Sequence, residues 1–170
     1  MLQHGFLRVG AAVPSVRVAD CDFNAGQVLD MMRRAEGEGV HVLVFPEMSL
    51  TGYTCADLFG QTILQRAALK SLVHIAAEAG RAYSGLAVVG LPLAVDDQVF
   101  NCAAVLHRGH IVGVVPKSFI PNYKEFYERR WFAAAATARS REVVLGGAAV
   151  PFGTDHLFAA SDVEGLVVGV

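Results

Sequence analysis

Cysteine is scarce in this sequence, and the few cysteines are not spaced as in a disulfide scaffold or a zinc site. The 170 residues contain three cysteines, Cys21, Cys55 and Cys102, and none of them belongs to a C-x-x-C pair. An odd, widely spaced set is typical of free thiols in a reducing compartment, because disulfide scaffolds and zinc sites need paired or clustered cysteines. We therefore expect neither disulfides nor a structural zinc, and we expect a cytoplasmic protein.

Excess charge of one sign and long apolar runs are also absent. The formal net charge is −2, with lysines and arginines scattered along the chain. Such a chain offers no positive field for a phosphate backbone, so nucleic acid is not an expected partner. No apolar run approaches the roughly 20 residues that cross a bilayer, and residues 1–10 lack the features of a secretory signal. A membrane is therefore not an expected partner either.

Metal and nucleotide motifs are missing as well. His107 and His110 flank a predicted turn, but two histidines without a third ligand do not make a metal site. The 17 glycines never form G-x-x-x-x-G-K or G-x-G-x-x-G, which are the loops that bind nucleotide phosphates. We expect neither a metal nor a cofactor in these residues.

Apolar residues are plentiful, at 54%, and can fill the core of one domain. Their spacing in the first half of the chain predicts alternating strands and helices. In chain order these are a strand over Phe6–Val13, a helix capped by Asp22 or Asn24 and ending at Gly37 or Gly39, a strand over Val40–Phe45, a helix over Ala56–Ala79 and a strand over Leu86–Leu91.

The second half of the chain predicts antiparallel strands. Phe100–Leu106 and Ile111–Val115 flank a short turn that contains Gly109, which is typical of a hairpin. Lys117–Arg130 breaks the apolar pattern with proline, aromatic and charged residues, as a long functional loop does. Further strands are predicted within Glu142–Phe152 and over Leu166–Val170. The combination indicates an α/β fold, and periodicity alone leaves a doubly wound sheet open.

Two apolar strands each end at a proline followed by a charged residue. The first runs from Val42 into Pro46 and delivers Glu47 to a polar loop, and the second delivers Lys117 directly after Pro116. Taken alone, either residue would be an ordinary surface charge. In α/β proteins, however, site residues from separate segments gather where strands meet loops. The two together predict a shared site.

In their order and surroundings these motifs resemble the glutamate and lysine of the Cys-Glu-Lys amidases of the nitrilase superfamily. In detail they are most similar to the glutaminase domain of glutamine-dependent NAD+ synthetases. The resemblance implies a nitrilase-like αββα sandwich, with two mixed sheets face to face and helices outside. It also implies that Glu47 is the general base and acid, and that Lys117 stabilises the thiolate and the oxyanion.

The same resemblance implies supporting roles for three further residues. Glu125, eight residues after Lys117, would orient the lysine and contact the substrate amide, although Glu128 lies close by in the sequence. Tyr53 and Tyr123, each six residues after its charged residue, would line the glutamine pocket. A phenol can hydrogen-bond a bound amino acid while its ring forms a wall of the cavity.

The nucleophile of this family is a cysteine that follows an apolar strand of the Val-Gly-Val type. Leu166–Val170 matches that strand, and no cysteine of the chain fits the required position. Cys55 lies in the loop after Glu47, where the motif places no nucleophile, and Cys102 has the surroundings of an inert buried thiol. We therefore expect residues 1–170 to be a single partial domain that ends before its catalytic cysteine.

The resemblance also implies partners for the complete enzyme. It would hydrolyse glutamine through a γ-glutamyl thioester and pass ammonia to a synthetase domain that amidates nicotinic acid adenine dinucleotide to NAD+. That domain would use ATP and Mg2+ and is expected to be absent from these residues. A homo-oligomer is expected as well.

Two alternatives stay open at this point. The first is a free-standing nitrilase-family amidase that acts on another small amide or carbamoyl compound. The second, from a different class, is a catalytically inactive scaffold or assembly subunit that is complete at Val170.

Overall fold

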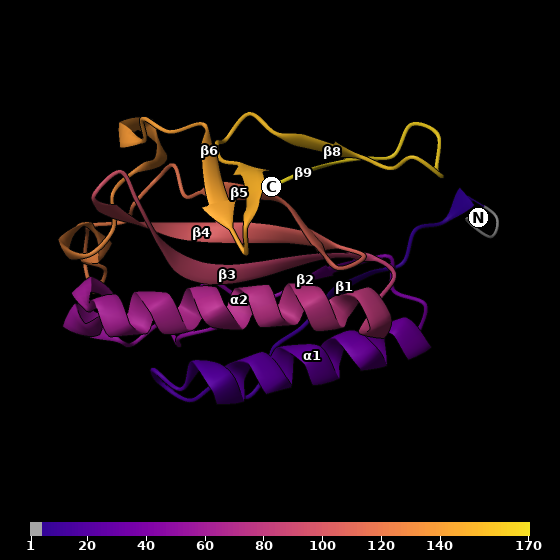
Figure 1. Cartoon of the computed structure of the whole chain (residues 1–170), viewed down its shortest axis with the longest axis horizontal. Coiled ribbons are helices and arrows are strands. Elements are labelled where there is room, and N and C mark those ends of the chain that lie inside the picture. Colours follow the sequence, from indigo (N-terminus) through magenta and orange to yellow (C-terminus); the bar gives the residue numbers. More distant parts are fainter. Residues whose placement is uncertain (1–4) are drawn as a thin grey trace.

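The computed structural model describes residues 5–170, which form a five-stranded mixed sheet with two helices on one of its faces (Figure 1). The strands lie side by side in sequence order: β1 (Val9–Ala11), β2 (Val42–Val44), β3 (Leu86–Val95), β4 (Gln98–His107) and β5 (His110–Pro116). The first three strands are parallel to one another, and β4 and β5 are each antiparallel to the strand before. As a result β5 runs in the same direction as β2, and both strands end at the same edge of the sheet.

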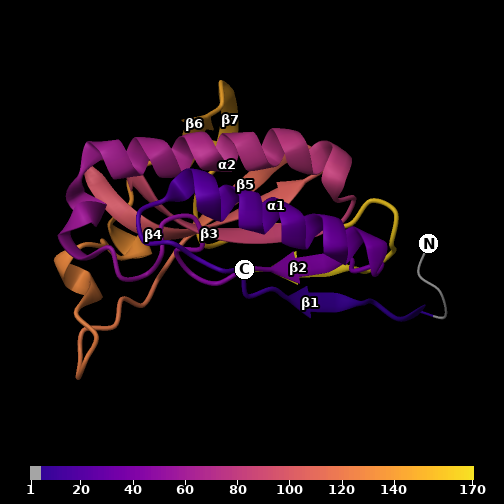
Figure 2. The same cartoon turned by 90° about the horizontal axis from the view of Figure 1, so that it is seen from below.

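The helices α1 (Cys21–Gly37) and α2 (Thr62–Ala82) lie next to each other beneath the sheet, as Figures 1 and 2 both show. Each helix buries one apolar face, including Val28 and Met32 of α1 and Leu72 and Ile75 of α2, all of which are fully buried. Burial of a side chain of this size stabilises the fold by about 1.5–3 kcal/mol. The alternation of strands and helices predicted for the first half of the chain is confirmed. None of the helices in the described part of the chain is long and apolar enough to cross a bilayer.

The start of α1 corrects the sequence expectation. The N-cap is Asp20, whose Oδ1 accepts a hydrogen bond from the Phe23 amide at 3.1 Å. Asp22 lies inside the first turn, where its charge favours the positive end of the helix dipole. Asn24 is fully buried and its side chain bonds the backbone of Arg17 and of the loop that follows β2. Asp20, two residues before Asp22, therefore caps the helix.

The predicted helix over Ala56–Ala79 is in fact two helices. A short 3-10 helix, η2, spans Ala56–Gly60, and α2 begins after Gln61, whose backbone is extended at φ −85° and ψ 122°. The strand predicted to end at Leu91 continues to Val95 and turns through Asp96 and Asp97, both with positive φ, into β4. β3 and β4 thus form a hairpin that was not predicted. The predicted hairpin between β4 and β5 is confirmed.

The other face of the sheet is covered by two short hairpins (Figure 1). One pairs β6 (Glu142–Leu145) with β7 (Ala148–Pro151), and the other pairs β8 (Leu157–Ala159) with β9 (Val167–Gly169). Phe152, directly after β7, forms a bridge to Val114 and packs edge-on against Phe100 at a centroid distance of 5.6 Å. The helix-covered mixed sheet of the expected sandwich is thus present. In residues 5–170 these hairpins stand where the expectation placed a second mixed sheet.

Candidate active site

Glu47 reaches the site because the chain leaves β2 and crosses over β3. Phe45 still bonds β3, through its amide to the Val88 carbonyl at 2.9 Å. The next residues pass over Gly90, where a β-carbon would lie 2.4 Å from the Pro46 carbonyl oxygen and 2.8 Å from the Glu47 α-carbon. Glycine at this position of β3 therefore permits the crossing. Without it, backbone would collide with a side chain.

The turn after Glu47 is held in an unusual backbone conformation. Met48 has a positive φ of 54°, a region that costs energy for any residue with a β-carbon. The Ser49 hydroxyl compensates by bonding β3 twice, accepting from the Gly90 amide at 3.2 Å and donating to its carbonyl at 3.1 Å. These contacts hold the strained turn in place and fix the backbone of Glu47.

Lys117 approaches from the other side, directly after β5. Its amide donates to the Asn101 carbonyl on β4 at 2.8 Å, which continues the strand pairing by one residue. The Asn101 side chain is buried, and its Nδ2 donates to Oε2 of Glu47 at 2.8 Å. Asn101 therefore positions both charged residues, one through its main chain and one through its amide.

The charged side chains form one connected network. Lys117 Nζ lies 3.0 and 2.9 Å from the two carboxylate oxygens of Glu47. It lies 3.4 and 3.2 Å from those of Glu128. Glu128 is almost fully buried, and its Oε1 accepts a hydrogen bond from the Tyr53 hydroxyl. The order of contacts is thus Tyr53, Glu128, Lys117, Glu47 and Asn101, and we call these five residues the site network.

The network determines the charge states of two of its members. Partial burial by itself lowers the pKa of Lys117, but hydrogen bonds to Glu47 and Glu128 and their charges outweigh it and leave the pKa above the ordinary lysine value. Burial and the hydrogen bond to Glu128 raise the pKa of Tyr53. At neutral pH, Lys117 is therefore a cation between two carboxylates, and Tyr53 is a neutral donor.

The structure brings the predicted Glu47 and Lys117 into direct contact, whereas it does not place Glu125 beside them. Glu125 is exposed, and the carboxylate that contacts Lys117 belongs to Glu128. The loop folds back on itself because the Glu128 amide bonds the Pro121 carbonyl at 3.2 Å. This turn directs Glu128 inward and leaves Glu125 in solvent, so the expected contact between Glu125 and the lysine is wrong.

The two predicted pocket tyrosines differ in position. Tyr53 belongs to the site network, with its hydroxyl bonded to Glu128. Tyr123 is 63% exposed and touches Phe126 edge-on at a centroid distance of 6.0 Å. Together with Lys117 and Arg129 it lines an open cavity of about 410 Å³. A substrate-binding role for each tyrosine stays a prediction.

Sequence reasoning missed Asn101 and assigned no role to Glu128. Asn101 interrupts the apolar residues of the predicted strand Phe100–Leu106, and a polar side chain on a buried strand needs a partner because unbonded burial costs energy. That interruption was a usable signal. For Glu128 no such signal exists, because the surrounding loop has no periodicity that distinguishes it from Glu125.

None of the cysteines is arranged as a nucleophile. All three are free and buried, and none makes a hydrogen bond to Glu47 or Lys117 within residues 5–170. Burial and the neighbouring Cys55 raise the pKa of Cys21 to about 11, and burial raises the pKa of Cys55 and Cys102 as well. Such thiols stay protonated at neutral pH and react slowly. Across the described residues, no three histidine, cysteine or acidic side chains are grouped as a metal site would require.

Comparison with known proteins agrees with the geometry. The carbon-nitrogen hydrolase family profile matches residues 8–170. The glutamine-dependent NAD(+) synthetases of Mycobacterium tuberculosis (strain H37Rv) and Mycobacterium leprae are 44% and 39% identical over 168 and 166 residues. These matches cover 99% and 98% of this chain but 24% of each relative, so the chain spans about a quarter of the length of these curated relatives.

A solved structure shows the same likeness in three dimensions. The crystal structure of a glutamine-dependent NAD(+) synthetase from Cytophaga hutchinsonii matches with a TM-score of 0.82 at 29% identity, over 92% of this chain and 26% of that one. Sequence and fold thus agree on one relationship. The chain belongs to the carbon-nitrogen hydrolase family of the nitrilase superfamily, and it resembles the N-terminal part of glutamine-dependent NAD+ synthetases.

Proposed function

We propose that these residues form the glutamate and lysine part of a glutamine-hydrolysing site, which supplies ammonia for the amidation of nicotinic acid adenine dinucleotide to NAD+. The main support is the contact of Lys117 with Glu47 at 2.9 Å, at one edge of a sheet that resembles the synthetase fold. An amide is a poor electrophile with a poor leaving group. A proton carrier beside a fixed cation meets both needs once a strong nucleophile is added.

The first half of the reaction uses a cysteine supplied from outside these residues. Glu47 takes the thiol proton, and the thiolate attacks the amide carbon to form a C–S bond. The carbonyl oxygen becomes an oxyanion beside the ammonium of Lys117. Glu47 then gives its proton to the amide nitrogen, the C–N bond breaks, and ammonia leaves a γ-glutamyl thioester.

The second half returns the enzyme to its starting state. Glu47 takes a proton from water, and the hydroxide attacks the thioester carbon. The C–S bond breaks, glutamate leaves, and the proton on Glu47 restores the thiol. Glu47 alternates between base and acid in both halves, while Lys117 keeps its charge because the carboxylate of Glu128 stays beside it.

Glu128 and Tyr53 support this cycle from behind the lysine. Glu128 also contacts Lys117, at 3.2 Å, so the lysine keeps a partner when Glu47 is protonated. The Tyr53 hydroxyl donates to Glu128, which leaves the lone pairs of its oxygen as acceptors for a substrate ammonium. Tyr123 forms part of the cavity wall next to Lys117 and would contact the rest of the substrate.

Ammonia would then be used at a separate ATP- and Mg2+-dependent site outside these residues, in a homo-oligomer. The test compares two nitrogen donors in the full polypeptide encoded by the reading frame. A chimaera in which this chain replaces the matching part of the Mycobacterium tuberculosis enzyme provides a second setting. Glu47→Gln and Lys117→Met should lower glutamine-dependent NAD+ synthesis by at least about 100-fold, and ammonium-dependent synthesis should persist.

Three results would contradict the proposal. One is equal loss with both nitrogen donors, which would mean that the substitutions damage the synthetase reaction or the fold. Another is an unmodified protein that hydrolyses other small amides faster than glutamine, which would favour a free-standing amidase. The third is a full polypeptide and a chimaera that both lack any amidase activity, as expected of a scaffold.

A further inference from the structure

Asp57 joins two short helices, each of which contains or follows closely a residue of the site network. It belongs to η2 (Ala56–Gly60), four residues after Tyr53. Its Oδ1 accepts from Arg130 Nε at 2.7 Å and from the Trp131 indole at 2.9 Å, and its Oδ2 accepts from Arg130 Nη2 at 2.9 Å. Arg130 is the last residue of η3 (Glu128–Arg130), the helix that begins with Glu128. One carboxylate thus receives three hydrogen bonds from the other loop.

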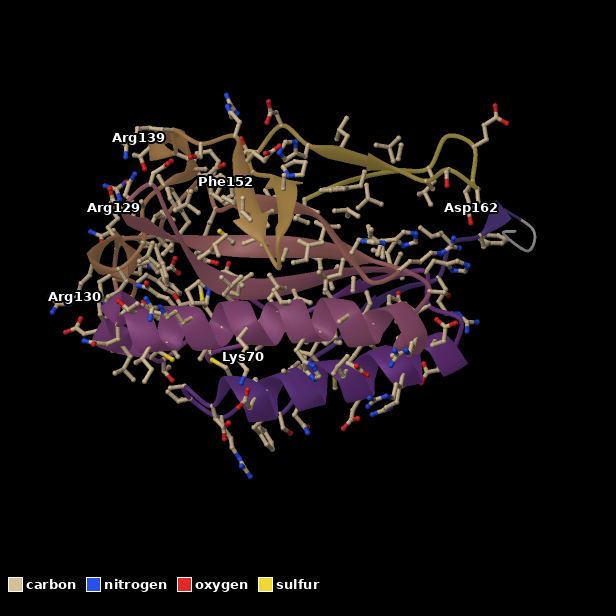
Figure 3. The ribbon with its side chains drawn as sticks, in the orientation of Figure 1. Lys70, Arg129, Arg130, Arg139, Phe152 and Asp162 are labelled. Atoms are coloured by element: carbon tan, nitrogen blue, oxygen red, sulfur yellow. The ribbon has the colours of Figure 1, made fainter. Side chains whose placement is uncertain are left out.

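Aromatic packing beneath Asp57 makes this contact geometrically specific. Phe59 of η2 is almost fully buried and packs against Phe132 and Trp131 at centroid distances of 4.8 and 5.8 Å. Tyr127 also packs against Trp131, at a centroid distance of 5.0 Å. Arg130 itself lies at the outer edge of the molecule, at the end where α2 begins (Figure 3). The two short helices are therefore held together both by this aromatic packing and by the ion pair between Asp57 and Arg130.

A rigid turn connects this contact to the site network. The amides of Trp131 and Phe132 both donate to the Glu128 carbonyl at 2.9 Å. Movement of Trp131 away from η2 would therefore move the backbone of Glu128. Glu128 lies between Tyr53, which comes from the η2 side, and Lys117, which comes from the η3 side. Glu128 keeps its contact with Tyr53 only if the two loops keep their relative positions.

We infer that Asp57 is a positioning residue that fixes η3 against η2 and so keeps Glu128 between Tyr53 and Lys117. Asp57 makes no hydrogen bond to Glu47 or Lys117 within residues 5–170, so it acts through Arg130 and Trp131. Its effect on turnover rests on the proposed function. Its effect on the arrangement of the two loops does not.

The size of the expected effect follows from exposure and geometry. The Arg130 and Asp57 side chains are 61% and 69% exposed, so solvent screens their charges and the pair adds little to global stability. Small displacements of catalytic groups, in contrast, reduce rates strongly, by up to about 100-fold for roughly 1 Å. Loss of Asp57 should therefore reduce the turnover rate clearly and change the unfolding temperature only slightly.

The loop arrangement can be measured without catalysis. Trp131 is the single tryptophan of the chain, so its fluorescence reports the contact directly. Asp57→Ala should shift the emission of Trp131 and speed hydrogen exchange of the Trp131 and Phe132 amides, and Asp57→Asn should do so less. The matched control is Asp155→Asn, which removes another exposed carboxylate paired with an arginine, Arg141, at 3.5 Å. If Asp57→Ala matches that control in both measurements, the inference is wrong.

Turnover is measured in the full polypeptide encoded by the reading frame, where hydrogen exchange of the same amides is repeated. Asp57→Ala should lower kcat for glutamine hydrolysis by about three- to thirtyfold with a smaller change in KM. Arg130→Gln should have a similar effect, and the double variant should be less than additive because both act through one contact. Altered fluorescence and exchange with a kcat equal to the Asp155→Asn control would overturn the positioning role. A wild-type protein without glutaminase activity would instead contradict the proposed function, and fluorescence would still decide the loop contact.

Discussion

The α-carbons of Gly90 and Glu47 approach so closely that a β-carbon on residue 90 would lie 2.8 Å from the Glu47 α-carbon. The φ of Gly90 is not in the positive region, so the need for glycine here is one of space rather than of backbone freedom. The chain crosses β3 at this point, and the obstacle to any side chain is backbone, which cannot rotate away.

We therefore expect Gly90→Ala to displace the Pro46–Met48 segment. Because Glu47 would lose its alignment with Lys117, glutamine hydrolysis should fall at least about tenfold. The free energy of unfolding should fall by about 1–3 kcal/mol from overpacking. Gly26→Ala is the control, since a β-carbon there meets nothing within 4 Å on helix α1. If both variants hydrolyse glutamine equally well, the crossing is not as tight as described.

The two candidate carboxylates of the loop can be separated by a pair of isosteric changes. Glu128→Gln removes the buried charge that holds Lys117, and we expect glutamine hydrolysis to drop by about 10- to 100-fold as the lysine loses its anchor. Glu125→Gln changes an exposed residue and should stay within about twofold of the wild type. Steady-state kinetics on both variants checks this. The reverse order would restore Glu125 as the supporting carboxylate.

The raised pKa of Lys117 predicts a pH dependence of stability. A group whose pKa is higher in the folded than in the unfolded chain stabilises the fold below the unfolded value, and this contribution disappears as pH rises through the folded value. Wild-type stability should therefore fall over the pH range above the ordinary lysine pKa of 10.5. Urea unfolding across that range should show a shallower fall for Lys117→Met.

The control for this measurement is Lys70→Met. Lys70 lies exposed on α2 and makes no salt bridge within residues 5–170, and Figure 3 labels it on the helix surface. Its replacement should leave the alkaline fall unchanged. Equal slopes in both variants would mean that the two carboxylates do not hold Lys117 as a cation in solution.

The three thiols should be unreactive in the native protein. All are buried, and the pKa of each lies above its ordinary value. A thiol reagent at about pH 8 should therefore label none of them rapidly, whereas denaturant should release all three cysteines of the chain. Rapid native labelling, lost in Cys55→Ala, would instead identify Cys55 as an accessible nucleophile.

Much of the site could be predicted because its two charged residues follow strands. The direction of a strand determines at which edge of the sheet the next residue lies. Glu47 and Lys117 meet because β2 and β5 end at the same edge. The route by which Glu47 reaches Lys117 was not predictable, since strand periodicity does not show that the chain crosses β3 at Gly90. That route depends on contacts between residues far apart in the sequence.

The loop and helix boundaries were harder to predict for a different reason. The predicted helix over Ala56–Ala79 ran through the extended Gln61, although its neighbours Gly60 and Thr62 are poor helix formers. Likewise, the choice between Glu125 and Glu128 depends on one hydrogen bond from the Glu128 amide to Pro121. Such tertiary and turn contacts have no periodic signature.

The placement of Asn101 on β4 has a consequence for how the site opens. β4 is paired along its length with β3 and from Cys102 to His107 with β5, so its amides should be among the slowest to exchange with solvent. Asn101 ties the Glu47 carboxylate to that persistent strand. Local opening of less protected segments should therefore leave the proton carrier tied to the part of the fold that opens last.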